Sequence, residues 1–206
     1  MRIKTTAITA AACLGLLIGA GGAGAAPLVG QPAPDFTGVD THGQTHTLHE
    51  LKGKTVILEW TNDGCPYVKK HYSSGNMQSL QKEETAKGIV WLTIASSAPG
   101  EQGNLAPAEH DALMQKRGAA PTAVIIDAEG TIGRAYGAQT TPHMFIITPD
   151  GNLAYMGGID DKPTTDVADI AGAHNYVRSA LAQIAAGKPV EPAVTRPYGC
   201  SVKYRS

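Results

Sequence analysis

The segment TVILEWTNDGCPYVKK, residues 55–70, combines three patterns that predict one local structure. Its first six residues are mostly β-branched, apolar or aromatic, which indicates a buried strand. A short polar loop follows, and Cys65 then precedes Pro66, a residue favoured at the first position of a helix. The Cys65 thiol is therefore expected at a helix N-terminus, where unpaired N–H groups and the helix dipole favour a thiolate. Because the thiolate is the reactive form of cysteine, the segment predicts sulfur chemistry.

A plainer interpretation is that Cys65 is a small buried hydrophobe, as many cysteines are. The polar loop before it, Pro66 after it, and Lys69 and Lys70 within one turn favour a reactive thiol instead. Asp63 acts in the opposite direction, because a neighbouring negative charge disfavours a thiolate. We interpret Cys65 as the reactive residue of the chain.

Residues 1–25 have the three-part pattern of a cleaved secretory signal. Arg2 and Lys4 come first, an apolar run follows, and small residues end the segment at Ala25. The run is short and glycine-rich for an uncleaved membrane anchor. We therefore predict cleavage after about Ala25 and a secreted or periplasmic protein.

The mature chain, residues 26–206, suits one domain with a core of its own. Without Arg2 and Lys4 it carries 15 basic and 18 acidic residues, a net charge of −3. With no basic stripe, the chain is not expected to bind nucleic acid. No later segment is long and apolar enough to suggest a membrane span in the mature chain.

Two cysteines remain after cleavage, Cys65 and Cys200, and an exported protein meets conditions in which disulfides persist. Cys200 lies in a short, turn-rich tail, residues 187–206, which we expect to be mobile. Such a tail could bring Cys200 to the helix-end thiol as a redox couple. The alternative is a permanent staple, which would differ in its reduction potential. The activated setting of Cys65 favours the redox couple.

Strand-like and helix-like segments alternate along the chain, which predicts an α/β layered sheet. A second helix is expected to be capped by Ser74 or Asn76. The expected elements are a hairpin at 35–40 and 44–48, strands at 55–60, 89–95 and 122–127, helices at 66–72, 77–87, 107–117 and 167–186, a helical turn at 130–136, and a closing hairpin at 144–147 and 153–156.

A set of short motifs, in this order and spacing, resembles a thioredoxin-fold redoxin. The motifs are Asp35-Phe36, LKGK at 51–54, the strand ending at Trp60, GCPYVK at 64–69, TPHMFII at 141–147 and GCSVKY at 199–204. The closest resemblance is to the peroxiredoxin-like branch of the alkyl hydroperoxide reductase/thiol-specific antioxidant (AhpC/TSA) family, over residues 33–204. It implies a thioredoxin-like fold, with a central mixed β-sheet flanked by helices and an N-terminal β-hairpin. The redoxin domain would span 26–186, and the C-terminal tail at 187–206 would carry Cys200.

The resemblance implies roles for several residues. Cys65 would be the attacking thiol and Pro142 a cis-proline beside it. Thr141 and Pro142 would shape the substrate groove, and Asn62 the loop of the thiol. Cys200 would condense with oxidised Cys65 to give a disulfide, which an external dithiol reductant then resets. No organic cofactor or metal is implied.

The chain departs from two patterns of these proteins. Asn62 stands where thioredoxins carry the first cysteine of Cys-x-x-Cys, so a local dithiol is missing. By alignment of the following strand, Pro142 stands where peroxiredoxins carry the arginine that holds the peroxide. Peroxide reduction and protein disulfide exchange therefore both remain open as the activity.

A metal-handling protein is the alternative from another functional class. Copper-assembly proteins of this fold use thiols with a histidine, and soft thiolate and imidazole ligands suit copper. Cys65 and His143 would be ligands here, with Cys200 as a further one. Otherwise His143 and His71 are interpreted as solvated or hydrogen-bonded, and Asp160 as a turn residue.

Overall fold

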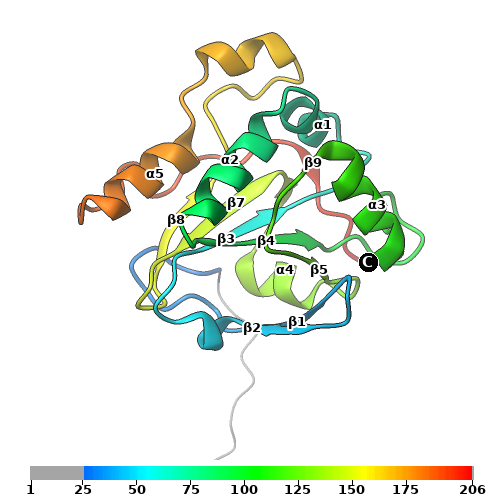
Figure 1. Cartoon of the computed structure of the whole chain (residues 1–206), viewed down its shortest axis with the longest axis horizontal. Coiled ribbons are helices and arrows are strands. Elements are labelled where there is room, and N and C mark those ends of the chain that lie inside the picture. Colours follow the sequence, from blue (N-terminus) through cyan, green and yellow to red (C-terminus); the bar gives the residue numbers. More distant parts are fainter. Residues whose placement is uncertain (1–25, 206) are drawn as a thin grey trace, which may run out of the picture.

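The structure is a computed structural model that describes residues 26–205. The predicted signal segment, residues 1–25, therefore lies outside the described residues. Seven strands form one mixed sheet in the order β2-β1-β5-β4-β3-β7-β8, and two short strands, β6 and β9, pair separately (Figure 1). The strands are β1 (Thr37–Asp40), β2 (Thr45–Thr47), β3 (Val56–Trp60), β4 (Val90–Ala95), β5 (Ala123–Ile126), β6 (Thr140–Thr141), β7 (His143–Ile147), β8 (Leu153–Gly157) and β9 (Cys200–Ser201). The helices are α1 (Pro66–Ser73), α2 (Asn76–Ala86), α3 (Pro107–Arg117), α4 (Thr131–Tyr136) and α5 (Tyr176–Ala185), with single 3₁₀ segments η1 (Leu48–Leu51) and η2 (Val167–Gly172).

The strand that leads to Cys65, β3, lies inside the sheet beside the middle strand β4. β3 pairs in parallel with β4 and antiparallel with β7, and all residues of these three strands are buried. Strands that read as almost continuous apolar runs are typically covered on both faces. This confirms the expectation of a central strand at 89–95, and it fixes the end of β3 as a rigid base for the loop that follows.

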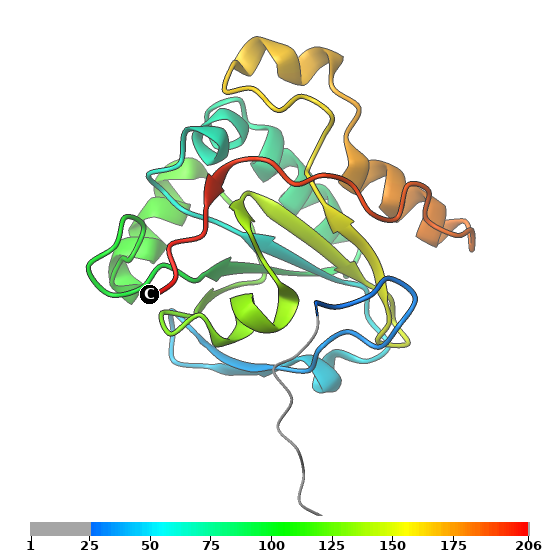
Figure 2. The ribbon, with the colours of Figure 1, turned by 180° about the vertical axis from the view of Figure 1, so that it is seen from behind.

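Apolar layers cover the two faces of the sheet (Figures 1 and 2). On one face, α1, α2 and α5 contribute Val68, Leu80 and Val177 to a cluster that also holds Cys65. On the other face, α4 and the N-terminal segments pack around Trp60 and other buried aromatic residues. Because successive strand residues point to opposite faces, the two clusters divide the side chains of β3 and β7 between them.

The predicted helix over 167–186 is wrong as one continuous element. The structure has the 3₁₀ segment η2, an extended break, and then α5. Asn175 is in an extended conformation, and its side-chain oxygen accepts a hydrogen bond of 2.9 Å from the Arg178 N–H. Asparagine is among the best N-cap residues, so it starts a new helix where the apolar spacing alone suggested continuity.

The predicted side-chain cap of the second helix is also wrong. α2 begins at Asn76 after Gly75, which has a left-handed φ of 76°, and no side chain caps it. Ser74 Oγ donates to the His71 carbonyl and accepts only a long contact of 3.4 Å from the Asn76 N–H, and the Asn76 side chain contacts the His71 ring. Both candidate caps are therefore engaged by α1, and a glycine makes the turn between the helices.

Among the helices of residues 26–205, none is both long enough and apolar enough to cross a bilayer.

Candidate active site around Cys65

Cys65 is the residue immediately before α1, in an extended conformation, with Pro66 in the first turn. Asn62 shapes the preceding loop through two contacts. Its carbonyl accepts from the Cys65 N–H at 3.1 Å, and its side-chain oxygen accepts from the Gly64 N–H at 2.8 Å. This is the turn chemistry for which asparagine is favoured, and it sets the direction in which the thiol leaves the sheet.

A second loop holds this turn from outside. The Asn62 amide nitrogen donates to the Gln102 carbonyl at 2.8 Å. Gly103 has a φ of 89°, and a Cβ there would stand 2.6 Å from the Asn62 side chain. Only glycine allows so close an approach in this conformation. The Gln102 side chain lies against Gly64. Sequence reasoning missed this contact, since nothing in residues 99–106 marks them as more than a loop.

Thr141 lies beside the thiol, and Pro142 follows it in the chain. The Thr141–Pro142 peptide bond is cis. The Cys65 Sγ donates to the Thr141 carbonyl at 3.0 Å, and the Cys65 side chain is completely buried. A buried polar group needs a partner, and Thr141 supplies one to the protonated thiol.

Cys200 reaches the same place from the end of the chain. β9 pairs antiparallel with β6, so that Cys200 lies opposite Thr141 and Ser201 opposite Thr140. Both cysteines are free thiols. The Val202 N–H continues the contact by donating to Gln139 at 3.0 Å. In Figure 2 the tail runs in red from α5 back across the molecule to this point. The tail expected to be mobile is instead packed in place over the thiol.

The two thiols differ in acidity. Burial acts to raise the pKa of Cys65, but hydrogen bonds from the side chains of Cys200 and Thr141 and from the Val68 N–H lower it below its ordinary value. Burial and the neighbouring Cys65 sulfur raise the pKa of Cys200 to about 11. Cys65 is therefore the more acidic of the two thiols, and Cys200 keeps its proton to higher pH.

A buried polar chain ties the tail to α1. The Asn76 amide lies 2.9 Å from His71 Nδ1, and His71 Nε2 lies 3.1 Å from the Tyr198 hydroxyl. Because the amide nitrogen can only donate, His71 Nε2 carries the proton and donates to Tyr198. The Tyr198 hydroxyl in turn donates to Asp160 Oδ1 at 2.5 Å.

This chain settles the surroundings of two residues considered above. His71 is completely buried, which lowers its pKa to about 4, so the ring is neutral near pH 7. Asp160 is also buried and anchors the tail through Tyr198. The turn role predicted for Asp160 is thus only part of its function, although the Lys162 N–H does donate to its Oδ1 at 2.9 Å.

His143 is not grouped with Cys65. Its ring packs 4.4 Å from the Phe145 ring, on the sheet face of the aromatic cluster, whereas Met144 points to the face of Cys65. Burial lowers the pKa of His143 to about 4. Within residues 26–205, no group of three or more potential ligands is placed to hold a metal ion.

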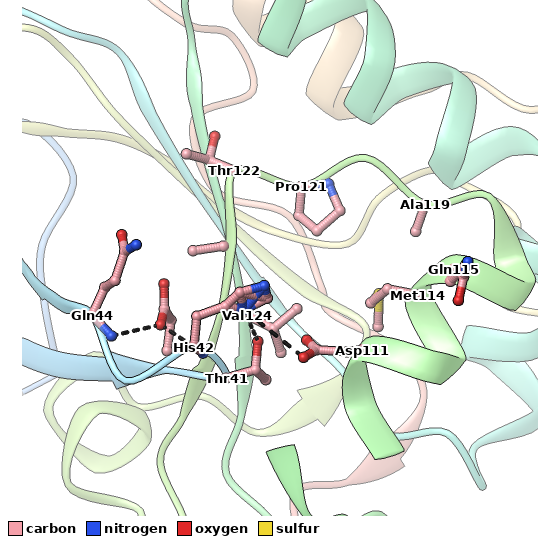
Figure 3. A pocket seen from close by; sticks show the side chains of 12 residues that line it. Thr41, His42, Gln44, Asp111, Met114, Gln115, Ala119, Pro121, Thr122 and Val124 are labelled. Atoms are coloured by element: carbon pink, nitrogen blue, oxygen red, sulfur yellow. Dashed lines mark hydrogen bonds and ion pairs between the residues drawn. The ribbon is translucent and has the colours of Figure 1, made fainter. Parts of the chain in front are cut away.

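Two hollows differ in their relation to the thiols. A cleft of about 540 Å³ is bordered by Thr140 and Gly199, which directly precede Thr141 and Cys200, by Tyr67, and by Asp160 and Arg196. A cavity of about 520 Å³ lies between the β1–β2 turn and α3, lined by residues such as His42 and Asp111 (Figure 3). Neither hollow is lined by a cysteine, but Thr140 and Gly199 make the cleft the hollow next to the two sulfurs along the chain.

The family model described as "AhpC/TSA family" matches residues 29–156. The thiol-disulfide oxidoreductase ResA of Bacillus subtilis is 27% identical over 124 residues, which are 60% of this chain and 64% of ResA. The matched region thus spans less than two thirds of that relative.

Solved structures share the fold. A hypothetical protein of Sinorhizobium meliloti aligns with a TM-score of 0.73 at 22% identity, over 88% of this chain and 97% of that one. A secreted disulfide oxidoreductase of Mycobacterium tuberculosis aligns with a TM-score of 0.50 at 19% identity, over 66% and 92%. The fold of the chain is thioredoxin-like, as predicted.

Proposed function

The chain belongs to the AhpC/TSA family, and from this premise we propose that it is an exported thiol-disulfide oxidoreductase in which Cys65 is the nucleophile and Cys200 its partner. Domain 26–186 carries the first sulfur and tail 187–206 the second. The similarity to ResA, a thiol-disulfide oxidoreductase, supports this assignment.

One observation carries the proposal: two free thiols meet at Thr141, whose carbonyl accepts from Cys65 Sγ and whose partner across the β6–β9 ladder is Cys200. A nucleophile needs a thiolate, and the lowered pKa of Cys65 favours one. The partner must keep its proton until the second step, and the raised pKa of Cys200 keeps it there. A permanent structural disulfide would not need one thiol to be more acidic than the other.

With a peroxide, the Cys65 thiolate attacks one oxygen and becomes a sulfenic acid, while the other oxygen leaves as alkoxide or hydroxide and takes up a proton. The Cys200 thiol then condenses with the sulfenic acid, forming the disulfide and releasing water. An external dithiol reduces this disulfide and is itself oxidised.

With a disulfide substrate, the Cys65 thiolate attacks one sulfur and the other leaves as a thiolate, which is then protonated. Cys200, once deprotonated, attacks Cys65 in the mixed disulfide and releases the second substrate thiol. Both routes end in the same Cys65–Cys200 bond, and they need no organic cofactor. Thr141 and Pro142 would line the approach to the sulfur, with Asn62 holding its loop.

Export is part of the proposal. A signal at residues 1–25, cleaved after about Ala25, would deliver the protein to a compartment where disulfides persist. A secreted oxidoreductase among proteins of the same fold agrees with this location. The resetting dithiol would then also be extracytoplasmic.

Stopped-flow mixing of reduced protein with hydrogen peroxide, or with a disulfide, tests the proposal. Mass spectrometry should find the loss of two hydrogens and a Cys65–Cys200 link, and neither should occur in Cys65→Ser. In Cys200→Ser the first step should persist and stop at a sulfenic acid or mixed disulfide. If Cys65 reacts no faster than free cysteine with either oxidant, the proposal fails. If its reaction is that slow with peroxide but faster with the disulfide, only the peroxidase route fails.

A further inference from the structure

The strand edge beside the reactive sulfur is already occupied. β6 is the backbone segment whose Thr141 carbonyl accepts from Cys65 Sγ, so an extended peptide that met this sulfur would lie along β6. Extended peptides bind proteins in this way, by adding a strand to an open edge. Here β9 of the same chain holds that position, with Cys200 opposite Thr141.

The fit of the tail at this edge is close. Gly199 has a φ of 141°, and a Cβ there would stand 2.1 Å from the Thr141 carbonyl oxygen. On either side of β9, the Tyr198 hydroxyl is bound to Asp160, and the Lys203 carbonyl accepts from the Ala98 N–H at 2.8 Å. The strand is therefore held at both ends as well as along its length.

We propose that β9 is a built-in occupant of the peptide-binding edge, and that the Cys65–Cys200 pair therefore acts on small molecules rather than on disulfides of folded proteins. This inference rests on the proposed function and names the substrate class of the same site. A protein substrate would have to displace β9 completely to pair with β6, whereas a small peroxide or disulfide needs only enough movement to reach the buried Cys65 sulfur.

The remaining opening has the size that this proposal requires. The cleft of about 540 Å³ lies within the range of about 300–1,000 Å³ usual for small-molecule sites. Tyr67 and Tyr198, whose ring centroids are 5.9 Å apart, supply an aromatic wall. Asp160 and Asp161 supply carboxylates and Arg196 a guanidinium, and Asp160 Oδ2 is buried without a hydrogen-bond partner. A small organic disulfide or hydroperoxide with a polar group suits this lining.

The accessibility of the sulfur gives a test that does not depend on turnover. In Cys200→Ser, Cys65 should react with iodoacetamide but much more slowly with a maleimide on a large polyethylene glycol. Adding Gly199→Val should remove this discrimination, because its Cβ collides with the Thr141 carbonyl. Gly172→Val is the matched control, since a Cβ there has nothing within 4 Å.

Substrate preference gives the second test. With both cysteines present, the wild type should reduce cystamine at least tenfold faster than insulin, and Gly199→Val should raise insulin reduction several-fold. If Gly199→Val does not fold, Val202→Pro releases the same strand by removing the N–H that donates to Gln139. Insulin reduction by the wild type as fast as by the released variants would overturn the inference. Failure to reduce either substrate, with size-selective alkylation intact, would instead overturn the proposed function.

Discussion

Arg117, the last residue of α3, forms an ion pair with Asp63, which lies two residues before Cys65. Its Nη2 is 2.7 Å from Asp63 Oδ1, and its guanidinium lies 4.3 Å from the Tyr72 ring centroid. The carboxylate that the sequence places against thiolate formation is therefore neutralised from a distant part of the chain.

Replacing Arg117 should make Cys65 less acidic. In Arg117→Gln the Asp63 charge is unmatched, and we expect the pKa of Cys65 to rise, because a neighbouring negative charge disfavours a thiolate. The pH dependence of Cys65 alkylation measures this shift. The double variant Arg117→Gln with Asp63→Asn should restore the wild-type pKa of Cys65. Lys116→Gln removes a neighbouring cation outside the ion pair and should leave that pKa unchanged. Equal values in Arg117→Gln and Lys116→Gln would contradict the prediction.

Removing the Tyr198 hydroxyl should loosen the tail. In Tyr198→Phe the buried His71 and Asp160 each lose a hydrogen-bond partner, and leaving such groups unpaired costs about 1–3 kcal/mol. Denaturant unfolding should report this loss, and peroxide-driven disulfide formation should slow because Cys200 is held less well.

Tyr67→Phe is the control for the Tyr198 prediction. Tyr67 packs against Tyr198 in the same cleft, so its variant removes a hydroxyl from the same surroundings. Equal stability of the two variants would show that the buried polar chain does not anchor the tail.

Glu59 should make the protein less stable as the pH rises. The carboxyl is completely buried and accepts hydrogen bonds from Trp91, Tyr72, Gln81 and Thr93, yet burial raises its pKa. The folded state then holds the proton more tightly than the unfolded state, so its contribution is fully present at acid pH and is lost as the pH rises through the raised pKa.

Glu59→Gln should remove that pH dependence. The glutamine amide can donate to the Tyr72 hydroxyl while its oxygen keeps the other donors. Unfolding between about pH 5 and about pH 8 should show a free-energy difference between Glu59→Gln and the wild type that grows with pH. Glu101→Gln, at an exposed carboxylate, is the control. A difference that stays constant would contradict the raised pKa.

His143 should act in the opposite direction. Burial lowers its pKa to about 4 from the ordinary value of about 6.5, so the unfolded state binds the proton first as the pH falls. Stability present above about pH 6.5 is then lost towards pH 4, by up to about 3 kcal/mol.

His143→Asn keeps an acceptor for the Gln139 N–H and should remove part of this acid slope. His71, whose pKa is also lowered to about 4, should account for a remaining part. Urea titrations across this pH range measure the slope, with His42→Asn as the surface control. An acid slope as steep in His143→Asn as in the wild type would refute the assignment.

Local patterns predicted most elements of the fold. The helix at 107–117 has proline at its start and Gly118 after its end, and the structure has α3 over the same residues. Strands 55–60 and 89–95 were predictable because buried central strands read as apolar runs. The start of the last helix was not predictable, because Asn175 acts as a cap only when the chain turns there to meet Asp160.

The site was predictable where one segment carries it. Cys65 and Asn62 lie in one loop, whose turn chemistry is visible in the sequence, and Pro142 came from a family resemblance. The ladder between β6 and β9 joins residues about sixty positions apart through two pairs, too short to leave a pattern. The face to which His143 points depends on the register of β7, which no composition reveals.

The pairing of β9 with β6 also has a topological consequence. A bond between Cys65 and Cys200 would turn the chain between them, 135 residues including four of the seven strands of the main sheet, into a closed ring. Ring closure on this scale restricts the unfolded chain and is worth about 5 kcal/mol in the chain-entropy model. The oxidised form would thus be more stable than the reduced form. Resistance to proteases and heat would therefore report the fraction of molecules that carry the disulfide.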